Sequence, residues 1–206
     1  MRQADRSVIF DCAVVLATVV VEQCDAFVEM CDYIEERQSI AKRIASYEAN
    51  ADGAFKNLGY YILDNRLMGD VDVTSLYEIV DAIEEITDQF EELANSLVRY
   101  NIAETGESLP ACANALYGAG QMAHDLILSL KDEAPASLVI RNINSLDKYK
   151  SKYCKFYDEA ILELFTDEVP AVDIIRSKAI YDAIKTVFEA FEKLSEQSYK
   201  YILTQN

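Results

Sequence analysis

The sequence predicts an all-α protein, and three observations support that prediction. Apolar residues recur every three or four positions along most of the 206 residues, as they do on the buried face of a helix. Six glycines and three prolines are too few for a β protein with many turns. A hydrophobic share of 51% with 27% charged residues is the balance of a folded, soluble chain. We therefore expect long helices joined by short turns.

The three prolines mark three helix starts. Pro110, Pro135 and Pro170 each follow a polar stretch and precede helical periodicity. Proline is favoured in a first helical turn, because its missing N–H would have no partner there.

Two further breaks complete the division into helices. Gly69 with residues 70–73 forms one, after which Ser75 and Glu78 match a capping box, and a weaker break lies at residues 35–38. The expected helices span residues 4–34, 38–67, 74–102, 109–131, 136–165 and 169–203.

The third expected helix has an apolar seam, and its charged residues between positions 77 and 98 are all acidic. The seam consists of Ile79, Ile83, Ile86, Phe90, Leu93 and Leu97. Residues 77–98 also carry seven acids and no Lys or Arg. The acids are Glu78, Asp81, Glu84, Glu85, Asp88, Glu91 and Glu92. Acids four apart on a helix repel one another by a few tenths of a kcal/mol, so they form either a solvated face or a site that gains a cation.

An internal repeat favours the second interpretation. A shift of about a hundred residues places 81-DAIEEITDQFEEL-93 on 182-DAIKTVFEAFEKL-194, with six identities in thirteen positions. Each half also has a long helix and a polar turn before this segment. We predict two tandem three-helix repeats, residues 4–102 and 109–203, in one elongated six-helix bundle that forms a single domain over residues 1–206.

The two copies differ in charge. The aligned pairs are Glu48 with Lys150, Asp52 with Cys154, Glu84 with Lys185, Glu85 with Thr186 and Asp88 with Glu189. Lysines in the second copy would neutralise its remaining acids, Glu189 and Glu192. A lost cation site would leave this pattern, and so would ordinary surface drift.

Carboxylates four apart on a helix point the same way, so two such helices side by side present four to six oxygen ligands. Divalent cations and iron bind such oxygen sets. We therefore predict a metal site in the first half only. Its expected ligands are Glu48, Asp52, Glu84, Glu85, Asp88 and Glu91.

Paired E/D-x-x-x-D motifs on adjacent helices, repeated in two halves, resemble PhoU and its relatives. They resemble most the PhoU-like putative phosphate transport regulators encoded beside Pit-type inorganic phosphate permeases. The segments 48-EANAD-52 and 83-IEEITDQFE-91 carry the resemblance, which extends over residues 8–202. Asn50 stands where relatives often have Glu.

The resemblance implies two related three-helix bundles with carboxylate-bound clusters of iron, zinc or similar cations. It also implies a regulator without enzymatic activity that contacts a phosphate permease, and it is compatible with a homodimer. All six predicted ligands match the family pattern position by position. The second half keeps only Glu189 and Glu192, so a second metal site is not expected.

Charge and cysteine content limit the partners and the compartment. A net charge of −17 disfavours nucleic acid and anionic bilayers and suits cations or basic partners. The five cysteines are odd in number and lack CxxC spacing, as in a reducing compartment. The longest apolar run, residues 12–21, is half a membrane span. We expect a cytoplasmic protein that does not insert into the membrane and that reaches its inner face only through a transporter.

Other classes fit less well. A ferritin-like di-iron enzyme needs Glu-x-x-His pairs, but the one histidine, His124, has Gln121 three residues before it. No phosphate-binding glycine motif occurs, and we expect 118-GAG-120 to mark close helix packing. A metal-dependent hydrolase or oxidase ranks third, because no nucleophile or general base stands out. The main alternative is a non-catalytic helical scaffold whose acidic face binds a basic protein without metal.

Overall fold

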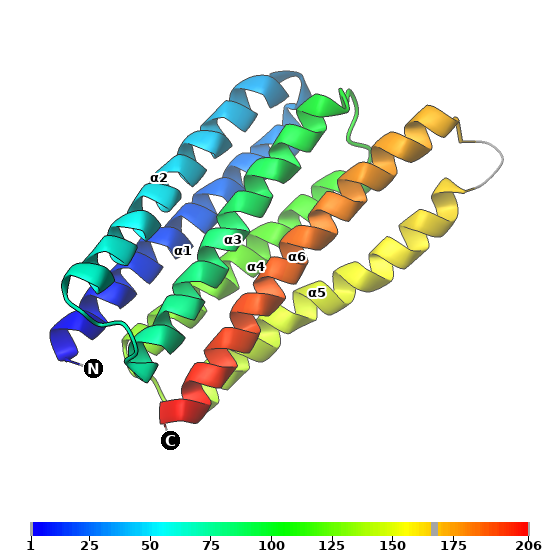
Figure 1. Cartoon of the computed structure of the whole chain (residues 1–206). Helices are drawn as coiled ribbons and strands as arrows, with labels where there is room; N and C mark the ends of the chain where they lie inside the picture. Colours follow the sequence, from blue (N-terminus) through cyan, green and yellow to red (C-terminus); the bar gives the residue numbers. More distant parts are fainter. Residues whose placement is uncertain (1, 166–168, 206) are drawn as a thin grey trace.

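The computed structural model describes residues 2–165 and 169–205, and these residues form helices and turns without a strand (Figure 1). The helices are α1 (Gln3–Asp32), α2 (Arg37–Asp64), α3 (Val71–Arg99), α4 (Ser108–Lys131), α5 (Ala136–Leu164) and α6 (Ala171–Gln205), with a short 3₁₀ turn, η1 (Ile34–Glu36), before α2. The all-α prediction and the six long helices are confirmed.

The helices lie side by side in an elongated bundle whose two outer helices have few neighbours (Figure 1). Helices α1, α2 and α3 pack against one another, and α5 packs against α4 and α6. Contacts of α1 with α4 and of α3 with α6 join these groups. Helices α2 and α5 therefore lie at opposite edges of the bundle.

The helix starts follow the predicted punctuation with one correction. Pro110 lies in the first turn of α4, and Pro135 and Pro170 immediately precede α5 and α6. Part of the turn predicted before Pro170, residues 166–168, lies outside the described residues.

The predicted capping box is wrong, because Ser75 and Glu78 both lie inside α3. The cap is Asp70, whose Oδ1 accepts the backbone N–H groups of Asp72 at 3.0 Å and Val73 at 3.2 Å. An aspartate at this position satisfies two of the amides that a helix leaves without partners, so α3 begins three residues earlier than we predicted.

Three helices end at a non-glycine residue in the left-handed region. Arg66, Asn101 and Glu133 have φ of 55°, 51° and 53°. The next residue then donates its N–H back into the helix, for example from Leu67 to the carbonyl of Ile62 at 3.0 Å. This closure is a Schellman motif, and it ends α2 and α3 about one turn before the predicted boundaries.

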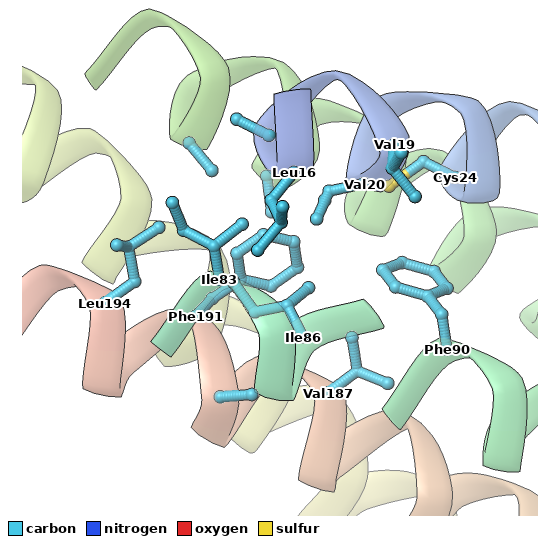
Figure 2. Packing of buried hydrophobic residues seen from close by; sticks show 14 of the residues in the cluster. Leu16, Val19, Val20, Cys24, Ile83, Ile86, Phe90, Val187, Phe191 and Leu194 are labelled. Atoms are coloured by element: carbon cyan, nitrogen blue, oxygen red, sulfur yellow. The ribbon is translucent and has the colours of Figure 1, made fainter. Parts of the chain in front are cut away.

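The predicted seam of α3 forms the centre of the core. Phe90 lies between Phe27 of α1 and Phe191 of α6, with ring centroids 6.4 Å away in each case. Figure 2 shows Ile83 and Ile86 pointing into the same cluster of apolar side chains. All six seam residues are at most 1% exposed. Burial of each such side chain stabilises the fold by about 1.5–3 kcal/mol.

Glycines of α4 allow close approach to its neighbours, as the sequence predicted. A Cβ added at Gly120 would lie 2.6 Å from Sγ of Cys24 on α1. One added at Gly118 would lie 2.5 Å from the hydroxyl oxygen of Tyr149 on α5. All five cysteines are free thiols, and burial raises the pKa of Cys24 strongly.

Helix α1 is the one helix among the described residues that is long and apolar enough to cross a membrane. Half of its most apolar window is buried inside the bundle, and the core helix of a soluble protein meets the same criterion. Whether the chain associates with a membrane stays a prediction.

We predict that Gly120→Ala destabilises the protein by about 1–3 kcal/mol, because the added methyl group overpacks the contact with Cys24. Cys24→Ala should rescue much of this loss in the double variant, so the two effects should not add. Denaturant unfolding measures both. The control is Gly59→Ala, whose Cβ meets nothing within 4 Å and which should stabilise α2 by about 0.5–1 kcal/mol. Equal stability of Gly120→Ala and the unchanged protein would contradict the close approach.

Candidate metal centre

Burial of the α3 seam fixes the rotation of the helix and directs its acids to both sides of the core. Toward α2 point Glu84, Asp88 and Glu91, and α2 presents Glu48 and Asp52 to them. We name these five residues the acidic groove. These are five of the six predicted ligands, and they lie within electrostatic reach of one another on two adjacent helices. That they bind a metal stays a prediction.

Of the five groove acids, Glu84 has the largest shift in pKa. Its removal from water raises the pKa first, and the negative charges of Asp88, Asp81, Asp52 and Glu48 raise it further, to about 7. A carboxyl group with this pKa is partly protonated at neutral pH. The fold thus holds Glu84 where a negative charge is unfavourable.

The pKa values of two other groove acids are raised for the same reasons. For Glu48 the causes are removal from water and then the charges of Glu91, Asp88 and Asp52. For Asp88, which still reaches solvent at the rim, they are partial removal from water and the charges of Asp52, Glu91 and Glu85. These mutual effects show that the carboxylates of α2 and α3 face one another.

The groove acids suit a hard cation in chemistry but do not surround a single point. All five are carboxylates, the ligands that divalent cations prefer. Within residues 2–165 and 169–205, however, no three His, Cys, Asp or Glu side chains are grouped closely enough to hold a metal ion. Asp52 instead accepts a hydrogen bond from Nζ of Lys56 at 2.6 Å. Metal binding would require side-chain rotation and the displacement of Lys56.

Glu85, the sixth predicted ligand, faces the other neighbour of α3. Nζ of Lys193 on α6 lies 2.5 Å from Oε2 of Glu85 and 3.0 Å from Oδ2 of Asp81. Glu92 forms an ion pair with Arg99, about two turns further along α3. Asp81, Glu85 and Glu92 thus have their own cations, whereas Lys56 is the one lysine that pairs with a groove acid among the described residues.

Sequence reasoning missed Lys193. The repeat contained a signal for it, because Lys193 aligns with Glu92 and so exchanges an acid for a base within the matching segment. The alignment did not reveal that Lys193 would form ion pairs with Asp81 and Glu85 of the other half.

The second half has an ion pair where the first half has repulsion. Nζ of Lys150 on α5 lies 2.5 Å from Oε2 of Glu192 on α6. The hydrogen bond between them is the main cause of the raised pKa of Lys150. Lys185 does not join them, because its Nζ lies over the ring of Tyr157 at 5.0 Å from the centroid. Of the two lysines expected to neutralise this copy, Lys150 therefore pairs with an acid and Lys185 contacts an aromatic ring.

No family model matches this chain, and no curated protein matches it. The resemblance to PhoU-like proteins therefore rests on the residues quoted above.

We predict that the metal-free protein loses stability as the pH rises from about 5 to about 7. Glu84 binds its proton more tightly when folded, so its contribution to the free energy of unfolding is fully present below its ordinary pKa of 4.5 and is lost as the pH rises through about 7. Glu84→Gln should flatten this decline. Denaturant unfolding in the presence of a chelator, between about pH 5 and pH 8, measures it.

Glu92→Gln is the matched control, because Arg99 lowers the pKa of Glu92 and the group does not titrate in this range. This variant should keep the decline. Parallel curves for Glu84→Gln and the unchanged protein would contradict the assignment to Glu84.

Proposed function

We propose that this chain is a metal-binding, PhoU-like regulator of inorganic phosphate uptake that acts through contact with a phosphate permease and is not an enzyme. The observation that supports the metal site best is the mutual repulsion in the acidic groove. Partial removal from water, and then the charges of acids on the same and the adjacent helix, raise the pKa values of Glu48, Glu84 and Asp88, and that of Glu84 reaches about 7.

A bound cation would remove this repulsion. In our proposal Glu48, Asp52, Glu84, Asp88 and Glu91 hold the metal, and Glu85 supports the site through its ion pair with Lys193. A divalent or iron cation supplies positive charge there and links α2 to α3. Iron and zinc are the cations that the resemblance implies.

We also infer that the two halves are repeats of one three-helix unit, with α1–α3 corresponding to α4–α6. Two aligned pairs support this inference. After removal from water, the charge of Glu91 is the next cause of the raised pKa of Glu48, and their counterparts Glu192 and Lys150 form an ion pair. The sequence alignment therefore pairs an interaction between α2 and α3 with an ion pair between α5 and α6. The same pair of positions repels in one half and attracts in the other, which supports a single metal site.

The regulatory part of the proposal rests on the resemblance and on charge. Cytoplasmic loops of membrane proteins carry an excess of Lys and Arg. A cytoplasmic protein with a net charge of −17 complements such a surface. In this proposal the groove acids of α2 and α3 are the part of the molecule that contacts a Pit-type permease.

The second candidate function is that of a non-catalytic scaffold whose acidic groove binds a basic protein without metal. It is favoured by the separation of the groove acids, of which no three in the described residues are grouped for a metal. Lys193, held between Asp81 and Glu85, shows how a lysine from another element can bind acids of α3.

We predict that removal of metal lowers the melting temperature of protein purified without chelator. At a metal concentration about 100 times Kd, the bound cation adds about 2.7 kcal/mol, which corresponds to roughly 5–10 °C for a chain of this size. Asp52→Asn with Asp88→Asn should abolish the metal dependence. Without metal, this double variant should melt at or above the temperature of the stripped unchanged protein, because two repelling charges are gone.

Glu189→Gln is the matched control in the second half. Because Lys150 and Glu192 already pair there, this variant should keep its metal content and its metal-dependent melting. Elemental analysis of aerobic and anaerobic preparations provides the second readout. Equal loss of metal from both variants would contradict a site in the first half only, and absence of metal from every preparation would favour the scaffold.

We further predict that deletion of the gene alters phosphate uptake or its response to phosphate supply. Growth on limiting phosphate and uptake of labelled phosphate measure the effect. A strain that expresses the Asp52→Asn, Asp88→Asn variant separates the two parts of the proposal, because it retains the folded protein without two of the five groove charges. Unchanged uptake in the deletion strain, with no redundant homologue present, would contradict the regulatory role while leaving metal binding to be judged by elemental analysis.

A further inference from the structure

One side of α5 carries four cations, although the protein as a whole is strongly acidic, and the exposed Glu159 follows them on the same side. At about 100° per residue, the four cations lie within a stripe about 60° wide. They are Arg141, Lys148, Lys152 and Lys155. All four are exposed, and none has a side-chain hydrogen bond or ion pair among the described residues.

A hollow of about 260 Å³ lies beside this stripe, between α4 and α5. Its lining consists of Met122 from α4 with Ser145, Lys148, Tyr149 and Lys152 from α5. No carboxylate among the described residues lines it, although acids outnumber Lys and Arg by 36 to 19 in the chain. The charged side chains that line the hollow, Lys148 and Lys152, are therefore both positive.

Helix packing provides the floor of the hollow. Because Gly118 has no side chain, the ring of Tyr149 lies directly against α4. The Tyr149 hydroxyl forms no hydrogen bond with the described residues, so its proton is available to a ligand. Ser145 donates to the carbonyl of Arg141 at 2.9 Å, and its hydroxyl can rotate toward the hollow instead.

Two ammonium groups and two hydroxyl groups thus line one small concave surface. Lys148 and Lys152 are four residues apart and so project from the same side of α5. Ammonium and hydroxyl groups donate hydrogen bonds to anionic oxygens, and charge makes the ammonium bonds stronger.

The strong negative charge of the whole protein favours a compact anionic ligand over an extended one. An extended polyanion or an anionic bilayer would also approach the surrounding acids and be repelled by them. A compact anion inside the hollow lies close to the lysines, while salt screens charges more than about 8 Å away. We propose that this hollow binds a small, multiply charged oxyanion of the phosphate or sulfate type. The site lies at the edge of the bundle opposite the acidic groove and is independent of it.

Titration with inorganic phosphate tests the site in the full-length, metal-stripped protein at low ionic strength. Calorimetry should show saturable binding, and the amide signals that shift in nuclear magnetic resonance spectra should centre on residues 145–152. Lys148→Gln and Lys152→Gln should each weaken binding by about fivefold, and the double variant by at least about tenfold. Tyr149→Phe should weaken it by about twofold and leave the melting temperature nearly unchanged.

Lys155→Gln is the matched control, because this lysine belongs to the same stripe but does not line the hollow. It should change the affinity by less than about twofold. The Asp52→Asn, Asp88→Asn variant should bind phosphate as the unchanged protein does, so the outcome does not depend on the metal site.

Three results would overturn the proposal. One is the absence of saturable phosphate and sulfate binding, and another is an equal loss of affinity in Lys155→Gln and Lys152→Gln, which would indicate a diffuse charged surface. The third is binding of polyglutamate or of phosphatidylserine vesicles through Lys148 and Lys152 without binding of free phosphate. That result would identify an acidic protein or a lipid surface as the occupant.

Discussion

The structure depends on the burial of one side of α3. This helix contacts α1, α2 and α6, and its seam from Ile79 to Leu97 is closed to solvent. Because the seam can face the core in only one way, the acids between the seam residues must leave on the two flanks. Hydrophobic burial of several kcal/mol outweighs repulsion of a few tenths of a kcal/mol per acid pair, so the fold tolerates charges in unfavourable positions.

The two flanks then meet different partners. On the side of α6, Lys193 neutralises Asp81 and Glu85. On the side of α2, the facing helix presents further acids, and the repulsion is left for a ligand or a partner to relieve. The corresponding helices of the second half have Lys150 against Glu192 and need no ligand. The contrast between repulsion in the first half and an ion pair in the second is our reason for proposing the first half as the functional one.

Local patterns predicted the helices and the seam, because helix period depends on neighbouring residues alone. The same carboxylate spacing placed acids of α2 and α3 near one another, while their binding of a metal stays a prediction. The ends of α2 and α3 were not predictable in this way. They depend on Arg66 and Asn101 adopting a conformation that sequence usually assigns to glycine. The position of Glu85 depended on Lys193, which is 108 residues away along the chain. Such a pairing follows from the packing of α3 on α6, and no pattern within either helix specifies it.

The separation of charge across the bundle connects the two proposed sites. The groove acids belong to α2 and α3 and the stripe of cations to α5, and α2 and α5 lie at opposite edges of the bundle (Figure 1). A basic permease surface would attract the groove acids and repel the cations of α5, so it would select one orientation of the molecule. In that orientation the hollow beside Lys148 and Lys152 faces away from the contact and stays open to solutes. A cation at one edge and an oxyanion at the other could then bind without competing for the same surface.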